Sequence, residues 1–197
     1  MLTIPTVEVR WFEEGTIPAV VKNWFYQDCP GEPLGFPEQR KDLYLYLPNC
    51  EVVSFKLRQE KLELKWRKAE FGTRQFGKAK VNYWEGKLEQ WFKCSYEDLT
   101  PLKIDYDYAE GLAAKSWIEV KKIRWQRSYQ DVACELTQLT VSDRIWWTIG
   151  LEMEQNKTNN SDYFENIVSE IGITYRGPQL AADKSYGYPA WCKDRVK

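Results

Sequence analysis

Two short runs of strictly alternating residues near the middle of the chain constrain the fold more than any other feature of the sequence. Charged residues occupy every second position in Phe55–Arg58 and again in Leu62–Arg67, with apolar residues between them. Successive side chains on a β-strand point to opposite faces. Each run therefore predicts a strand with one charged face and one apolar face, and the polar residues Gln59–Lys61 predict a hairpin connection between the two.

The same alternation recurs along the chain and predicts a β-rich protein. The segment 81–95 shows it with an interruption at Gly86, which is typical of a bulge or bend. The other predicted strands are Val7–Trp11, Lys41–Pro48, Ser116–Tyr129, Val132–Val141 and Arg144–Gln155.

Helix signals are confined to two segments. A short helix is predicted after Thr16, which is a suitable N-cap residue. A second helix is predicted over Asp162–Ile171, where apolar residues recur at helical spacing between the N-cap Ser161 and the terminating Gly172. Proline- or glycine-containing loops are predicted at Asp28–Glu38 and Ala69–Lys80.

Composition narrows the possible functions. The chain has 197 residues, a net charge of -1 and no histidine, so nothing indicates general nucleic-acid binding, and histidine-based catalysis and metal ligation are excluded. Its five cysteines are scattered, which is typical of free thiols in a reducing compartment. No linker, signal peptide or membrane-spanning segment is evident, so residues 1–197 are expected to form one cytoplasmic domain that does not contact a membrane.

The charged faces of the predicted strands carry both signs. If the sheet closes into a barrel, these side chains line its interior, where they must pair with one another or bind something. Lysine and arginine suit phosphate oxygens, and carboxylates suit Mg²⁺ or Mn²⁺. The basic members are Arg10, Lys56, Arg58, Lys65, Arg67, Lys122 and Arg124, and the acidic members are Glu8, Glu63, Glu135, Glu152 and Glu154.

In order along the chain, these motifs resemble the CYTH superfamily, the triphosphate tunnel metalloenzymes. Thr6–Arg10 is similar to the family's opening E-x-E-x-K strand, with Thr6 in place of the first glutamate. Lys56–Arg58 resembles its R-x-R strand, Lys122–Arg124 its later K-x-R strand, and Glu152–Glu154 its closing E-x-E strand. The late helix and Lys184–Tyr186 resemble the family's C-terminal segment.

The resemblance implies a single β-rich α+β domain, an antiparallel barrel of about eight strands with a few flanking helices. It further implies that the interior binds a triphosphate or another polyphosphate or organophosphate, and that hydrolysis requires Mg²⁺ or Mn²⁺. The implied metal ligands are Glu8, Glu152 and Glu154. The implied ligand-binding residues are Arg10, Lys56, Arg58, Lys65, Arg67, Lys122 and Arg124.

Two other functions remain open. Because a fold does not determine a function, the barrel could bind an anion without catalysis, or it could be structural, with interior charges that pair only with each other. Some charged residues also have simpler interpretations. Glu85 and Glu89 are predicted to face solvent, and Arg67 could form an outward ion pair with Glu63.

Overall fold

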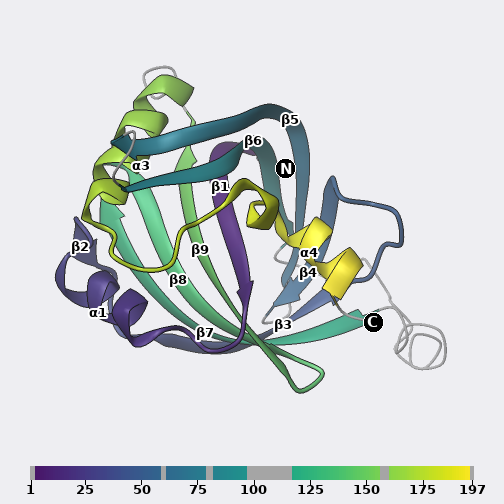
Figure 1. The fold of residues 1–197 in the computed structure, drawn as a ribbon. Helices are drawn as coiled ribbons and strands as arrows, with labels where there is room; N and C mark the ends of the chain where they lie inside the picture. The colour runs from purple at the N-terminus through teal and green to yellow at the C-terminus, as the bar shows by residue number, and fades with distance from the viewer. Residues whose placement is uncertain (1–2, 59–60, 79–81, 97–116, 156–159, 196–197) are drawn as a thin grey trace, which may run out of the picture.

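The computed structural model describes residues 3–58, 61–78, 82–96, 117–155 and 160–195. These residues form nine strands in one antiparallel sheet, which closes into a barrel of eight strands because β7 pairs with both β3 and β8 (Figure 1). The short strand β2 pairs only with β7. The strands are β1 (Ile4–Glu14), β2 (Glu32–Pro33), β3 (Glu38–Leu45), β4 (Val53–Arg58), β5 (Lys61–Lys78), β6 (Asn82–Tyr96), β7 (Trp117–Tyr129), β8 (Val132–Val141) and β9 (Arg144–Glu154).

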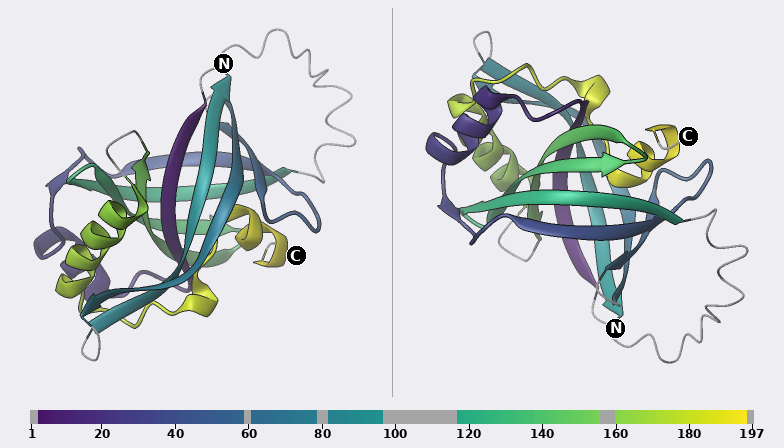
Figure 2. Two further views of the ribbon diagram at one scale, coloured as in Figure 1. Left: turned by 90° about the horizontal axis from the view of Figure 1, so that it is seen from above. Right: turned by 90° about the horizontal axis from the view of Figure 1, so that it is seen from below.

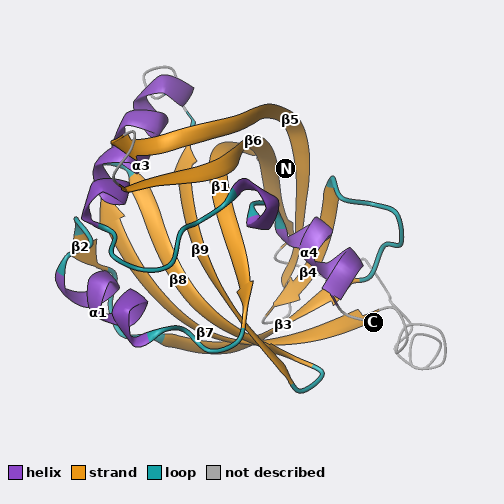
Figure 3. Cartoon of the chain, viewed as in Figure 1, coloured by secondary structure: helices purple, strands orange, loops and turns teal. Residues whose placement is uncertain are grey.

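Three α-helices flank the strands in the described part of the chain (Figure 3). Helices α1 (Ala19–Gln27) and α3 (Ser161–Thr174) lie on one side of the barrel, and α4 (Tyr188–Arg195) lies on the other (Figure 2). A 3₁₀ helix, η1 (Ala182–Lys184), precedes α4. The predicted fold class, a β-rich α+β barrel of about eight antiparallel strands with flanking helices, is therefore confirmed. None of the described helices is long and apolar enough to cross a membrane.

The barrel buries apolar side chains on its outside and charged ones on its inside. On β1, Val7, Val9 and Trp11 belong to the main apolar core together with residues of α1 and α3, whereas Glu8 and Arg10 line an interior cavity. On β8 and β9, likewise, Leu136 and Leu151 belong to the apolar core, whereas Glu135 and Glu152 line the cavity. Two helices can thus cover the apolar face while the charges turn inward, as the alternating pattern predicted.

Aromatic side chains fill one end of the barrel. Phe12 of β1 stacks between Tyr186 and Trp191 of the C-terminal segment, with ring centroids 5.3 Å away in each case. Tyr44 of β3 stacks on Tyr188, also at 5.3 Å. These rings form a second core that joins α4 to the strands, and such pairs add to the free energy of burial.

Strand β5 is longer than the sequence analysis predicted. The segment Ala69–Lys80 was expected to be a loop, but β5 continues to Lys78. Register shifts occur between Arg67 and Ala69 and between Glu70 and Thr73, and Gly72 has a positive φ of 81°. A glycine in this conformation lets a strand bend and continue, so a signal that resembled a loop belongs to a bulged strand.

Three smaller expectations also change. Gly86 does not interrupt β6; a Cβ there would lie 2.5 Å from Trp11 and from Val9, so this glycine permits close packing of β6 on β1. Thr16 does not cap α1, which begins after Pro18. In α3 the capping side chain is Asn160, which accepts a hydrogen bond from the backbone N–H of Tyr163, and the helix continues beyond Gly172.

The remaining differences lie in the segments around β3. The loop expected over Asp28–Glu38 contains β2, and β3 begins at Glu38 and ends at Leu45 instead of running from Lys41 to Pro48. Most of the hairpin connection predicted at Gln59–Lys61 lies outside the described residues.

Trp191 is fully buried in the aromatic core, so Trp191→Ala is expected to lower the free energy of unfolding by about 3–5 kcal/mol. Chemical denaturation measures the change. The control is Phe36→Ala, because Phe36 is 96% exposed and its removal should change stability by less than about 0.5 kcal/mol. Equal effects of the two substitutions would contradict the docking of α4 described here.

Candidate functional site

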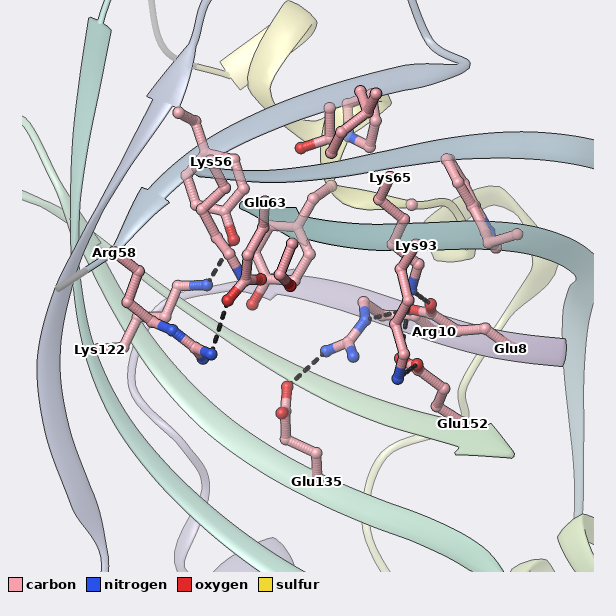
Figure 4. Close-up of a pocket in the computed structure, with 18 of the residues that line it drawn as sticks. Glu8, Arg10, Lys56, Arg58, Glu63, Lys65, Lys93, Lys122, Glu135 and Glu152 are labelled. Carbon is pink, nitrogen blue, oxygen red and sulfur yellow. Dashed lines mark hydrogen bonds and ion pairs between the residues drawn. The ribbon is translucent and has the colours of Figure 1, made fainter. Parts of the chain in front are cut away.

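A cavity of about 380 Å³ lies inside the barrel (Figure 4). Six of the seven predicted ligand-binding cations line it: Arg10, Lys56, Arg58, Lys65, Lys122 and Arg124. Of the predicted metal ligands, Glu8 and Glu152 line it. Residues from all eight barrel strands and from the start of α4 therefore meet at one place, although what they bind stays a prediction.

On one side of the cavity, two carboxylates are shared among three cations. Glu8 accepts a hydrogen bond from Arg10 Nε at 2.7 Å and contacts the ammonium of Lys65. Glu152 lies 3.2 Å from Lys65 Nζ and 3.1 Å from Lys93 Nζ. Arg10 and Lys65 therefore connect Glu8 to the other charged residues of the interior.

Glu135 extends this chain of ion pairs to the opposite wall. One of its oxygens lies 2.8 Å from Arg10, and the other lies 3.2 Å from Arg124. Arg124 also contacts Glu38. A single carboxylate of β8 therefore connects Arg10 of β1 with Arg124 of β7.

Strand β3 completes the chain. Arg40 lies 2.8 Å from Glu38 and 3.2 Å from Asp42. The other oxygen of Asp42 lies 2.9 Å from Lys122 Nζ, and Lys122 also donates a hydrogen bond to the hydroxyl of Tyr44 at 2.7 Å. Asp42 is fully buried, so its charge depends on these two cations.

A separate triad stands next to this chain. Glu63 of β5 lies 2.5 Å from Lys56 Nζ and 2.6 Å from a terminal nitrogen of Arg58. Lys56 and Arg58 come from β4, where they share one face. Like the other interior carboxylates, Glu63 therefore serves two cations.

Cations outnumber carboxylates in this network. Among the described residues, eight cations form ion pairs with six carboxylates, a surplus of two positive charges. Glu154 lies at the rim, where its side chain is 64% exposed and 3.3 Å from Lys93, so solvent screens it. The cations are Arg10, Arg40, Lys56, Arg58, Lys65, Lys93, Lys122 and Arg124, and the carboxylates are Glu8, Glu38, Asp42, Glu63, Glu135 and Glu152.

The surplus of positive charge shows in the pKa values of two lysines. Burial lowers the pKa of Lys56 from 10.5 to about 8, and the nearby charge of Lys122 acts in the same direction. Burial likewise lowers the pKa of Lys122 to about 8, although Asp42 opposes the shift. At this corner of the cavity the neighbouring carboxylates do not offset the cost of burying the two ammonium groups, and an added anion would reduce that cost.

The position of Arg10 depends on a glycine. Gly150 of β9 is the direct cross-strand neighbour of Arg10, and a Cβ on Gly150 would lie 2.3 Å from the guanidinium carbon of Arg10. The guanidinium can therefore lie against the backbone of β9 and reach Glu135 only because this position has no side chain.

The predicted metal ligands do not fit a divalent metal site. All four oxygens of Glu8 and Glu152 contact protein cations, and Glu154 points toward the rim beside Lys93. The position of the family's first glutamate is the buried Thr6. Among the described residues there is no group of three Cys, Asp or Glu side chains that could hold a metal ion.

Arg67 lies outside the cavity, in a second buried cluster. It contacts Glu89 at 2.5 Å and Glu70 at 3.0 Å. Glu89 is only 3% exposed and also accepts a hydrogen bond from the indole of Trp91. The prediction that Glu89 faces solvent is therefore wrong. Its strand neighbour is Glu8, so both carboxylates share the inner face of the sheet.

The cavity residues that were absent from the predicted site include Arg40, Lys93 and Tyr188. Alternation could have revealed the first two, because Glu38, Arg40 and Asp42 alternate on β3 and Trp91, Lys93 and Ser95 alternate on β6. Tyr188 gave no such signal. Its ring lies 4.1 Å from Lys122 Nζ and 5.1 Å from the Arg10 guanidinium, a contact that only the folded chain reveals.

Comparison with known proteins finds distant structural neighbours, while no family model and no curated protein matches the sequence. A conserved hypothetical protein from Pyrococcus furiosus is 13% identical with a TM-score of 0.48, covering 94% of this chain and 98% of that one. A protein from Bacillus halodurans provisionally assigned as an adenylate cyclase is 12% identical with a TM-score of 0.41, covering 88% and 95%. The Pct1 RNA triphosphatase of S. pombe is 9% identical with a TM-score of 0.41, covering 78% and 72%.

None of these TM-scores reaches 0.5, so the fold assignment depends on the barrel itself. A closed antiparallel barrel of eight strands with a charged interior is the architecture that the resemblance to the triphosphate tunnel family implies. The chemistry of the interior has to be argued from this chain's own side chains.

Acid should weaken the interior network. Burial alone would raise the pKa of Glu152, but Lys65 and Lys93 outweigh it and lower the pKa from 4.5 to about 2. In the same way, Arg10 and Arg124 lower the pKa of Glu135. As pH falls, these carboxylates take up protons at a higher pH in the unfolded chain than in the folded protein. The stabilisation from their ion pairs is therefore present above about pH 4.5 and is lost as pH falls toward about 2.

Denaturation at several pH values tests this expectation. Glu152→Gln should cost roughly 1–3 kcal/mol at neutral pH and should show a smaller loss of stability between about pH 4.5 and about pH 2 than the parent protein. An identical acid-induced loss in both proteins would contradict the role given to Glu152.

Proposed function

We propose that this protein binds a small phosphorylated anion, such as a triphosphate or an organophosphate, inside the barrel. The observation that carries the proposal is that eight cations face one cavity of about 380 Å³ while their carboxylate partners are already shared. Charged walls around a cavity of low dielectric concentrate the local potential. Arginine and lysine are the side chains that recognise phosphate groups most effectively.

The proposed binding position is the corner formed by Lys56, Arg58 and Lys122. Lys56 and Arg58 share the single carboxylate of Glu63, and Lys122 lies close enough to Lys56 to lower its pKa. A phosphate placed there would accept hydrogen bonds from these side chains and offset their repulsion. Figure 4 draws Lys56, Arg58 and Lys122 on one side of the view and Glu152 on the other.

The proposal is binding without a resident metal. The expected Mg²⁺ or Mn²⁺ at Glu8, Glu152 and Glu154 is not included, because lysine and arginine already bind the oxygens it would need. A purely structural barrel would also pair its interior charges, but it would not need an open cavity with surplus cations on its wall. These two features support binding over a structural role.

Removing a cation at the proposed corner should weaken binding. Lys56→Met and Lys122→Met are each expected to raise the dissociation constant for inorganic triphosphate about tenfold or more, since a charge-assisted hydrogen bond contributes about 1.5–3 kcal/mol. Calorimetry at low salt measures the constant, and a phosphate-release assay runs on the same samples.

The matched control for these variants is Lys41→Met, because Lys41 is 65% exposed and outside the cavity. If the parent protein bound neither inorganic triphosphate nor any organophosphate, the proposed function would be wrong. Release of phosphate by the parent would extend the function from binding to hydrolysis.

Affinity should also fall as pH rises through about 8. Lys56 and Lys122 lose their protons near that pH, and a neutral amine no longer offsets the charge of the anion. Calorimetry with an organophosphate monoester, whose second pKa of about 6 keeps its charge nearly constant between about pH 7.5 and about pH 9.5, should show this decline. Lys56→Met/Lys122→Met should bind weakly with little pH dependence, and a flat profile in the parent would contradict the assignment.

A further inference from the structure

Lys65 reaches a position between two carboxylates that belong to neighbouring strands. Glu8 of β1 and Glu152 of β9 are direct cross-strand partners, so their side chains stand next to each other on the inner face. Lys65 comes from β5, and β6 separates β5 from β1. Its ammonium contacts one oxygen of Glu8 and lies 3.2 Å from one oxygen of Glu152.

The other oxygen of each carboxylate is also bound. Arg10 Nε lies 2.7 Å from Glu8 Oε1, and Lys93 Nζ lies 3.1 Å from Glu152 Oε1. The side chains of Glu8 and Arg10 are only 4% and 7% exposed. A second cation could therefore reach both carboxylates only if it displaced a side chain that the protein already holds there.

Trp91 helps to fix Lys65. The Lys65 ammonium lies 5.6 Å from the centroid of the Trp91 ring, a distance at which the ring attracts a cation. The indole N–H of Trp91 donates to the buried Glu89 at 3.1 Å, which fixes the orientation of the ring. The ammonium is thus held by two carboxylates and one aromatic face.

We propose that the ammonium of Lys65 occupies the cation position between Glu8 and Glu152, so that the cavity binds its anion without a divalent metal. This inference rests on the proposed function and deepens it, because it states what balances the carboxylates at the same site. It also implies that the carboxylate pair is a latent metal site, which becomes available when the charge of Lys65 is removed.

The charges favour the ammonium over Mg²⁺ or Mn²⁺. Lys65, Arg10 and Lys93 already surround two carboxylates, so a divalent ion would add two positive charges to a region where cations are in excess. Mg²⁺ further requires six oxygen ligands in nearly octahedral geometry. Without the ammonium of Lys65, one oxygen of Glu8 and one of Glu152 would face the cavity, and water could supply the remaining ligands.

The test measures Mn²⁺ binding to the full-length protein in the absence of any phosphate ligand. Two readouts monitor binding: the electron paramagnetic resonance signal of free Mn²⁺ and the melting temperature of the protein. The parent should show no saturable site. Lys65→Met should bind Mn²⁺ about tenfold or more tightly than the parent, and Mn²⁺ should raise its melting temperature. Adding Glu152→Gln to that variant should abolish the gain.

Two controls make the result specific. Lys121→Met also removes one positive charge, but Lys121 is 60% exposed and lies outside the cavity, so it should gain no Mn²⁺ site. Lys65→Arg keeps the charge and should also gain none. A Mn²⁺ site in the parent that Glu152→Gln removes would overturn the proposal, as would a folded Lys65→Met without a gain.

The parent measurement decides the question even if Lys65→Met does not fold. A separate experiment distinguishes this inference from the proposed function. The parent is titrated with inorganic triphosphate, first in the presence of a metal chelator and then in the presence of Mg²⁺. Affinity in the chelator that Mg²⁺ does not increase supports both. Binding that requires Mg²⁺ overturns this inference and the metal-free form of the proposed function, but leaves anion binding itself standing. No binding in either condition overturns anion binding, while the Mn²⁺ result still stands.

Discussion

Each of the six carboxylates in the cavity network serves two cations, and the rest of the structure depends on this sharing. A buried charge is tolerated only when partners offset the loss of its hydration. Glu135 illustrates the arrangement, because it contacts Arg10 with one oxygen and Arg124 with the other. Six such carboxylates connect the inner faces of the strands, so the interior can remain polar and still leave room for a cavity.

This polar interior requires that the apolar core lie elsewhere. The outward residues of β1, β8 and β9 pack against α1 and α3, and the rings around Trp191 fill one end of the barrel. Closure of the sheet is part of the same arrangement, since an open sheet would expose the ion pairs to water and weaken them. The helices outside and the charges inside are therefore two consequences of one alternating pattern.

Alternation explains how much could be predicted from the sequence. It indicated most of the strands and six of the cations that line the cavity, because a period of two fixes which face a side chain occupies, whereas the closed barrel was implied by the family resemblance. It could not show that Arg67 pairs with Glu89 outside the cavity, since that depends on how far each strand is shifted against its neighbour. Bulges near Gly72 change the register of β5 against β6, and this register cannot be predicted from the local sequence.

The same limit explains the missed residues and the unsupported metal site. Arg40 was overlooked because β3 begins directly after Pro37, within a segment that resembles a loop. The resemblance to the triphosphate tunnel family implied that Glu8 and Glu152 bind a metal, but Lys65 arrives between them from another strand. Whether a carboxylate is available to a metal is decided by residues distant in sequence.

The wall of the cavity near Glu63 carries more hydrogen-bond donors than acceptors. A lysine carries three N–H donors and an arginine carries five, while a carboxylate offers two oxygens. Lys56 and Arg58 meet at Glu63, which accepts from both, so donors exceed acceptors along this wall. A well-packed core would remove the excess by excluding the donors. This barrel instead keeps a cavity beside them, which is the arrangement expected if an anion supplies the missing acceptors.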